Sequence, residues 1–169
     1  MVRVENYPRT LRPPIECRCI YTDGMDLVDE LAPRGFDCVC GNIRMAARAV
    51  TSVYDRHLKD AGVSASQMAV LWAVAYACGL SVKELAGRIA MDETTLIRNL
   101  RALEKQGWVS LAVGTDRRRR LPALTESGRK VFGAALPHWQ KAQKEVGALL
   151  DERLSDTNRK LLRLTRAIA

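Results

Sequence analysis

Residues 81–124 combine two short predicted helices with a β-hairpin that follows them directly. The helices span 81–90 and 92–106, and each opens on a residue that favours an N-cap and repeats its apolar residues at three- and four-residue steps. Segments 108–113 and 119–124 read as two strands on either side of a turn sequence. This order of elements predicts a mainly α fold built on a winged helix-turn-helix, in which the hairpin adds a small β element.

The second of these helices has one apolar face and one polar, basic face. Its leucines recur at i, i+4 and i+7 and are expected to be buried: Leu96, Leu100 and Leu103. Such a helix fits the major groove of DNA, where its first turn reaches base edges and later cations reach phosphates. We therefore predict that the opposite face binds DNA through Thr94, Thr95, Arg98, Asn99, Arg101 and Lys105.

Four consecutive arginines, Arg117 to Arg120, lie near the tip of the predicted hairpin and follow the turn sequence Gly114-Thr115-Asp116. Arginine held at a hairpin tip can enter a narrow minor groove, where the negative potential is strongest, and its neighbours can neutralise phosphates. A run of like charge is more often a solvated surface turn. Here the predicted helix pair that precedes the arginine run favours contact with DNA.

The rest of the chain divides around the winged domain, which we place at 63–125. Residues 37–62 predict one long amphipathic helix with Asp37 as its N-cap and Gly62 as its stop. Residues 126–169 predict two more helices. A capping box, Ser64 to Gln67, opens a further helix at the start of the winged domain, and a second box, Ser81 to Glu84, opens the first helix of the pair. Prolines interrupt residues 1–36, which we expect to form an irregular N-terminal arm with one short helix.

Charge and composition indicate a polyanionic partner. The net charge is +8, and the first 36 residues carry five arginines against six acidic residues, so the remainder carries about +9. A basic body of this kind makes double-stranded DNA the first candidate. The N-terminus lacks the apolar stretch of a secretory signal and no apolar run could cross a bilayer, so we expect a cytoplasmic protein that binds no membrane.

The sequence disfavours an enzyme. Its only two histidines, His57 and His138, lie far apart, and no nucleophile elbow, phosphate-binding loop or paired-carboxylate motif is present. We expect no catalytic residue and no cofactor. A winged helix that binds another protein is the rival interpretation, but such a wing has no need of four arginines beside Arg98 and Arg101.

Three motifs in the winged region are those of a known family: the helix ending Leu103-Glu104-Lys105-Gln106-Gly107-Trp108-Val109, the pattern Asp116-x-Arg118, and Leu124-Thr125-x-x-Gly128. In their order and distance they resemble the MarR family of bacterial transcription regulators, over roughly residues 37–168. The resemblance implies a homodimer whose helices within 37–62 and 126–169 form an intertwined dimerisation domain. Two winged modules would then contact a pseudo-palindromic operator about one DNA turn apart.

The resemblance also implies roles in the wing and a means of control. Asp116 would brace Arg118 by a salt bridge, and Arg117 or Arg119 would be the finger that enters the minor groove. The family implies a regulator, here expected to be a repressor, that a small and often aromatic anion releases from DNA.

Five residues are candidates to face a ligand cavity and to hold a carboxylate or an acyl thioester: Arg44, Arg48, Tyr54, His57 and Trp72. Simpler structural roles are open for each. The arginines would form salt bridges across the dimer, the tryptophan would fill the core, and the histidine would lie on a helix surface.

Cysteines offer an alternative signal. Cys38 and Cys40 open the first long helix, where backbone N–H groups and the nearby Arg44 form a setting typical of reactive thiols. With Cys17 and Cys19 they make two C-x-C pairs that could form a thiolate metal site, although zinc sites usually have C-x2-C spacing, and we assign no metal. Packing of small buried cysteines at a dimer contact is the preferred interpretation, ahead of redox or metal sensing.

Overall fold

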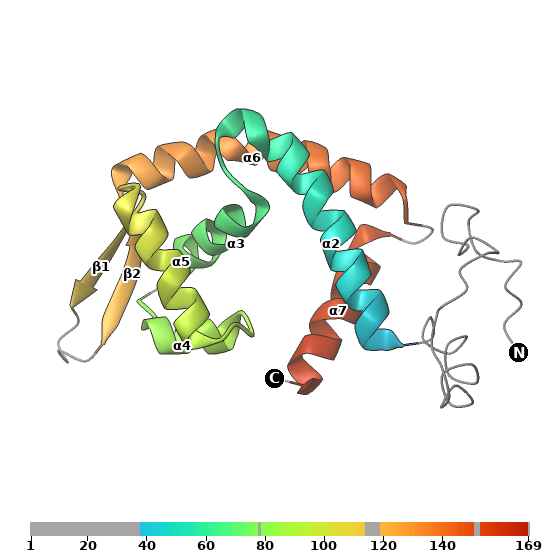
Figure 1. Ribbon diagram of the computed structural model, residues 1–169, viewed down its shortest axis with the longest axis horizontal. Helices are drawn as coiled ribbons and strands as arrows, with labels where there is room; N and C mark the ends of the chain where they lie inside the picture. Colours follow the sequence, from blue (N-terminus) through green and yellow to red (C-terminus); the bar gives the residue numbers. More distant parts are fainter. Residues whose placement is uncertain (1–37, 78, 114–118, 151–152, 169) are drawn as a thin grey trace, which may run out of the picture. The chain divides into compact units, whose positions relative to one another are not determined.

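The computed structural model describes residues 38–77, 79–113, 119–150 and 153–168. These residues are mainly helical, with one two-stranded antiparallel sheet, as Figure 1 shows. The fold class predicted from the sequence, a mainly α winged helix, is confirmed. Contacts divide the chain after Arg44, and the packing described below lies within residues 45–169. The predicted arm, 1–36, lies outside the described residues.

Helix α2 spans Val39–Leu58 and continues into the 3-10 turn η4, Lys59–Ala61. The turn ends at Gly62, whose φ of +67° is a left-handed conformation that glycine adopts without steric cost. The sequence predicted this stop correctly. Asp37, the predicted N-cap, lies outside the described residues.

Helices α3, Ala65–Ala75, and α4, Val82–Arg88, both begin with the capping boxes predicted from the sequence. In α3 the Ser64 hydroxyl accepts the Gln67 N–H at 3.1 Å, and the Gln67 side chain accepts the Ser64 N–H at 2.9 Å. In α4 the corresponding distances between Ser81 and Glu84 are 3.3 Å and 2.7 Å. Each box satisfies two donors that a helix N-terminus otherwise leaves without partners.

Helix α5 spans Glu93–Lys105, and the carboxylate of Asp92 accepts the Thr95 N–H at 2.9 Å to cap it. The turn between α4 and α5 contains Ala90 with a φ of +51°, the one positive φ at a non-glycine residue in the described ranges. This conformation allows the chain to turn sharply between the two helices, but it brings the alanine side chain close to the backbone.

The core fixes the orientation of α5. Leu96, Leu100 and Leu103 of α5 are at most 1% exposed, and they pack in one cluster with Leu71 of α3 and Leu85 of α4. Burial of each leucine contributes about 1.5–3 kcal/mol. Because these leucines occupy one face of α5, the polar face is turned outward.

The wing is a hairpin of β1, Val109–Val113, and β2, Arg120–Leu124. The strands are antiparallel, with Val109 opposite Leu124 and Leu111 opposite Pro122. In a sheet of two strands Pro122 occupies an edge, where its missing N–H is tolerated. The observed strands agree with the predicted ones to within one residue at each end.

The base of the wing is closed by bonds between its entry and its exit. The carbonyl of Trp108 accepts the Thr125 N–H at 3.1 Å. The Thr125 hydroxyl donates to the Gly107 carbonyl at 2.6 Å and accepts the Gly128 N–H at 2.9 Å. A Cβ added to Gly128 would lie 1.8 Å from the carbonyl oxygen of Trp108, so only glycine fits there.

Helix α6 spans Glu126–Ala148 and contains Pro137, which has no N–H to donate to the carbonyl of Gly133. Helix α7 spans Leu154–Ile168 and has no buried residue. None of the helices in the described part of the chain has the length and apolar character needed to cross a membrane.

Candidate nucleic-acid interface

The polar face of α5 presents most of its predicted DNA contacts to solvent. Thr94, Arg98, Arg101 and Lys105 are exposed, whereas Thr95 and Asn99 are half-buried. The position of Thr95 follows from the cap, since its N–H faces the Asp92 carboxylate. The amide nitrogen of Asn99 lies 3.9 Å from the sulfur of Met91, which turns this side chain toward the start of the helix.

In the wing, the structure describes Arg119 and Arg120, both exposed. Asp116, Arg117 and Arg118 lie outside the described residues, so their predicted salt bridge and minor-groove role stay predictions. Arg119 is already paired: its Nη2 lies 2.8 Å from Oε2 of Glu84, at the start of α4.

The carboxylate of Glu84 therefore accepts hydrogen bonds both from the N-cap of α4 and from the wing. It accepts the Ser81 N–H and the Ser81 hydroxyl, each at 2.7 Å, and the guanidinium of Arg119 at 2.8 Å. The hydrogen bonds from Ser81, and then the one from Arg119, lower the pKa of Glu84 to about 2. The carboxylate is thus ionised at any physiological pH.

The sequence predicts the bond of Glu84 to Ser81 in the capping box but not its bond to Arg119. The capping bond is visible at i, i+3, but Arg119 lies 35 residues away in the sequence. No local spacing relates the two positions.

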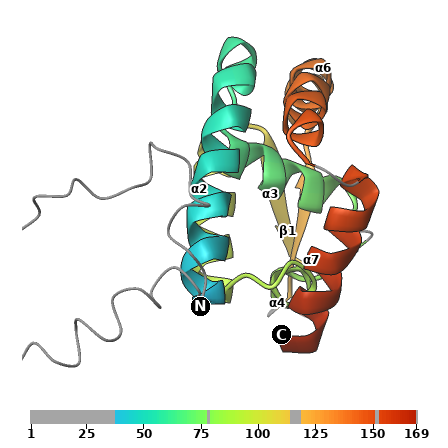
Figure 2. The ribbon, with the colours of Figure 1, turned by 90° about the vertical axis from the view of Figure 1, so that its right-hand side faces the viewer.

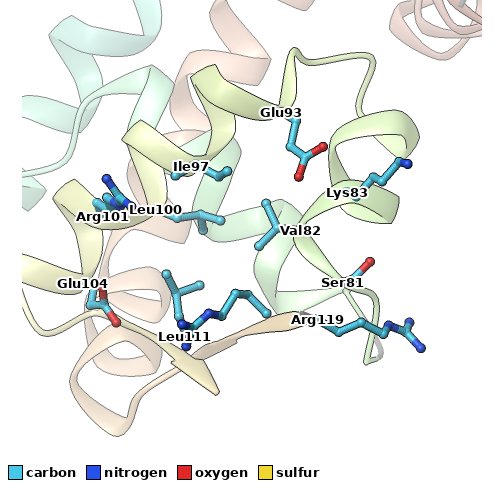
Figure 3. Close-up of a pocket in the computed structure, with 11 residues that line it drawn as sticks. Ser81, Val82, Lys83, Glu93, Ile97, Leu100, Arg101, Glu104, Leu111 and Arg119 are labelled. Atoms are coloured by element: carbon cyan, nitrogen blue, oxygen red, sulfur yellow. The ribbon is translucent and has the colours of Figure 1, made fainter. Parts of the chain in front are cut away.

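A groove of about 540 Å3 lies between α4, α5 and the wing. In Figure 3, Val82, Leu100 and Leu111 gather in the middle of the groove, with Arg101 toward one end and Arg119 toward the other. The basic lining residues come from all three elements: Lys83, Arg101, Arg119 and Arg120. Glu93 and Glu104 also line the groove, so the charge around it is mixed.

Of the predicted DNA contacts on α5, Arg101 lines this groove, whereas Thr94, Arg98 and Lys105 are not among its lining residues. Arg101 of α5 and Arg120 of β2 both line it.

A second pocket, of about 490 Å3, is lined by residues of α2, α3 and α6, together with Ile89. Figure 2 shows the ribbons of these three helices. Of the five predicted ligand residues, Tyr54 and Trp72 line it. His57 is instead half-buried with its Nε2 2.7 Å from the Glu145 carboxylate. Arg44 and Arg48 are exposed on α2 and are not among the lining residues.

The described cysteines lie at the start of α2. Cys38 and Cys40 are both free and exposed, and the Cys38 sulfur accepts the Gly41 N–H at 3.4 Å. Cys17 and Cys19 lie outside the described residues, so the predicted four-cysteine group is not tested. Within the described ranges, no group of three or more His, Cys, Asp or Glu side chains could hold a metal ion.

Comparison with known proteins places this geometry among transcription regulators. Residues 61–119 match the profile of the MarR family. The chain is similar to the transcriptional regulator MosR of M. tuberculosis, solved in complex with DNA, with a TM-score of 0.70 and 33% identity. That likeness covers 77% of this chain and 95% of the MosR chain.

Two further proteins similar to this chain are also transcription regulators or share their fold. The structure of S. aureus MepR, solved in complex with DNA, has a TM-score of 0.63, with 21% identity over 78% of this chain and 96% of that one; this likeness shows the fold alone. The HTH-type transcriptional regulator YwoH of Bacillus subtilis is 28% identical over 90 residues, which are 53% of this chain and 66% of that protein. The chain thus spans just under two thirds of the length of this relative.

Proposed function

Because this chain belongs to the MarR family of winged-helix transcriptional regulators, we propose that it is a sequence-specific DNA-binding protein. In this proposal α5 enters the major groove and the wing follows the neighbouring backbone into the minor groove. The observation that carries it is the shared groove, because Arg101 of α5 and Arg120 of the wing border the same concave surface. The DNA complex of MosR, at 33% identity, supports this assignment.

The exposed residues of α5 divide by position into two roles. Thr94 and Arg98 lie in its first two turns, where side chains reach base edges, and Arg98 has the geometry for a bidentate bond to guanine. Arg101 and Lys105 lie farther along the helix and suit phosphates. In the wing, Arg120 is assigned to phosphate, and Arg117 or Arg119 keeps its predicted role as the minor-groove finger.

We assign the functional state as a homodimer, because α2 and α7 leave large apolar side chains exposed. These are Val39, Ile43, Met45 and Val50 on α2, and Leu161, Leu162, Leu164 and Ile168 on α7. A 15-residue helix such as α7, with no buried residue, gains too little to be stable in isolation. Pairing with a second copy would cover these faces and place two winged modules on a pseudo-palindromic site.

The regulator is proposed to act as a repressor that a small molecule releases. The pocket lined by Tyr54 and Trp72 supports this part of the proposal, because it lies between helices of the winged unit and α2. A molecule bound there would change how these helices pack against each other. Because α2 also belongs to the proposed dimerisation domain, that change would alter the distance between the two winged modules.

The test is a gel shift and fluorescence anisotropy titration with the DNA upstream of the chain's own coding region. Arg98→Ala is expected to weaken specific binding about ten- to a hundredfold, as expected for loss of a bidentate base contact. Arg120→Ala should lower the slope of log affinity against log salt by about one. Lys144→Ala, an exposed charge on α6, serves as the control that should change neither.

Tight binding of that DNA by both Arg98→Ala and Arg120→Ala would contradict the proposed interface. A chain that binds no DNA but captures a protein through the wing would instead favour the protein-interaction module.

Cysteine sensing is a second candidate for the signal, and the exposure of both Cys38 and Cys40 at the start of α2 favours it. If it operates, peroxide should weaken DNA binding by the wild type and leave a Cys38→Ser/Cys40→Ser variant unaffected. An equal response in both proteins would rule the cysteines out as the sensor.

A further inference from the structure

The pocket between α2, α3 and α6 has an almost wholly apolar wall. Its lining residues are Val50, Thr51, Tyr54, Ala65, Met68, Ala69, Trp72, Ala73, Ile89 and Trp139. At about 490 Å3 it falls in the size range of small-molecule sites. Among the described residues that line it, none carries a charge.

The few polar atoms in this wall offer little to an anion. Thr51 contributes a hydroxyl from the exposed side of α2. The Tyr54 hydroxyl donates to the side-chain oxygen of Gln143, so its proton is already in use. Burial raises the pKa of Tyr54, which keeps the phenol neutral at physiological pH.

Two basic side chains on the adjoining part of α2 already have an acidic partner. Arg56 and His57 both pair with the carboxylate of Glu145 on α6. The hydrogen bonds from His57 and then from Arg56 lower the pKa of Glu145, so that carboxyl group stays ionised and holds both partners. A carboxylate entering the pocket would lose its hydration without gaining a counter-ion.

A cluster of aromatic rings forms part of the pocket wall, and it favours ligands that are flat. The Trp72 ring lies 4.9 Å from the ring of Trp139 and meets Phe132 edge-on at 5.4 Å. These contacts hold the Trp72 and Trp139 rings, which both line the pocket, against each other. Flat unsaturated molecules gain more from such a wall than aliphatic ones of equal area.

We propose that this pocket binds an uncharged, flat, largely apolar molecule, and not the aromatic anion that the family resemblance led us to expect. The inference rests on the proposed function only in that such a molecule would act as the releasing signal; binding itself requires no DNA.

The test uses two probes of nearly equal shape and different charge, 1-naphthalenemethanol and 1-naphthoate, titrated calorimetrically into the full chain. The wild type is expected to bind the alcohol at least about tenfold more tightly than the carboxylate, because the anion alone loses its hydration. Equal or tighter binding of 1-naphthoate would overturn the proposal, as would absence of binding of the alcohol up to its solubility limit.

A matched pair of variants on α3 ties the selectivity to this pocket. Ala69→Lys places an ammonium group in the lining, whereas Ala75→Lys places the same group elsewhere on the exposed side of the same helix. Both positions tolerate lysine, which has a high helix propensity. Ala69→Lys should narrow or reverse the preference for the alcohol, and Ala75→Lys should retain it. An unchanged preference in Ala69→Lys would place the binding elsewhere and refute the assignment.

The DNA readout separates this inference from the proposed function. Anisotropy with the upstream DNA should show release by the alcohol and little by 1-naphthoate. If the chain bound no DNA, the calorimetric selectivity would still decide the chemistry of the pocket. If it bound DNA and neither probe entered the pocket, the inference alone would fail.

Discussion

The guanidinium of Arg119 and the carboxylate of Glu84 lie 2.8 Å apart, so the residue next to β2 is fastened to the capped start of α4. Both side chains are about half exposed, at 48% and 49%, which leaves the pair open to competition from phosphate and salt. The ion pair therefore holds this end of the wing beside α4, but phosphate or salt can displace it.

Glu84→Gln is expected to strengthen DNA binding about two- to fivefold at low salt, because it removes a negative charge from the interface and releases Arg119. The helix cap should survive, since Gln67 closes the same kind of box at the start of α3. Anisotropy titrations across a salt series measure the effect. In an Arg119→Ala background, Glu84→Gln should increase the DNA affinity by less. An equal increase in that background would mean that release of Arg119 does not cause the tighter binding.

Acid should remove the contribution of Glu84 to stability. Its pKa falls from 4.5 to about 2 in the folded chain. A depressed folded-state pKa adds stability above the unfolded-state value, and this stability is lost as the pH falls toward the folded-state value. Urea unfolding at pH 7, 4 and 3 should show the wild type losing its advantage over Glu84→Gln between about pH 4.5 and 2. A constant difference over that range would contradict the assignment.

Gly128→Ala should destabilise the fold by about 1–3 kcal/mol or more, because the new methyl group would overlap a rigid backbone carbonyl. The Cβ would lie 1.8 Å from the Trp108 oxygen, and the wing would have to move away from α6. Gly133→Ala is the control, since nothing lies within 4 Å of its Cβ position on the same helix. That change should stabilise by about 0.5–1 kcal/mol. Thermal unfolding of the two variants should therefore shift in opposite directions.

Ala90→Gly should leave stability unchanged or raise it by up to about 1 kcal/mol, because glycine adopts a positive φ without a Cβ clash. The same replacement at Ala102, an exposed position in the last turn of α5, should lower stability by up to about 1 kcal/mol. Calorimetric melting of both variants checks the contrast. A loss at Ala90 as large as that at Ala102 would show that the φ of +51° carries no strain.

The local parts of the fold could be predicted because their causes lie within a few residues. The boxes at Ser64 and Ser81, the cap at Asp92 and the leucine face of α5 all follow from spacing at i, i+3 and i, i+4. The strands of the wing followed from turn chemistry and differ from the prediction by one residue at most.

The non-local parts could not be predicted. The sequence placed Tyr54 and His57 on one helix and assigned both to a ligand, but packing gave His57 the carboxylate of Glu145, 88 residues away. Helical periodicity identifies a face but not the partner that will cover it. The same limit hid the contact between Arg119 and Glu84.

The proline in α6 gives that helix a natural bending point. At Pro137 one backbone bond is absent, and a Cβ at Gly133, whose carbonyl loses that bond, would meet no atom within 4 Å. On one side of this point, Gly128 holds the helix against the wing, and on the other, Gln143 bonds to Tyr54 of α2. Trp72 of α3 contacts Phe132 before the proline and Trp139 after it, so these ring contacts restrain α6 across the missing bond and keep the hairpin at a set angle to α3.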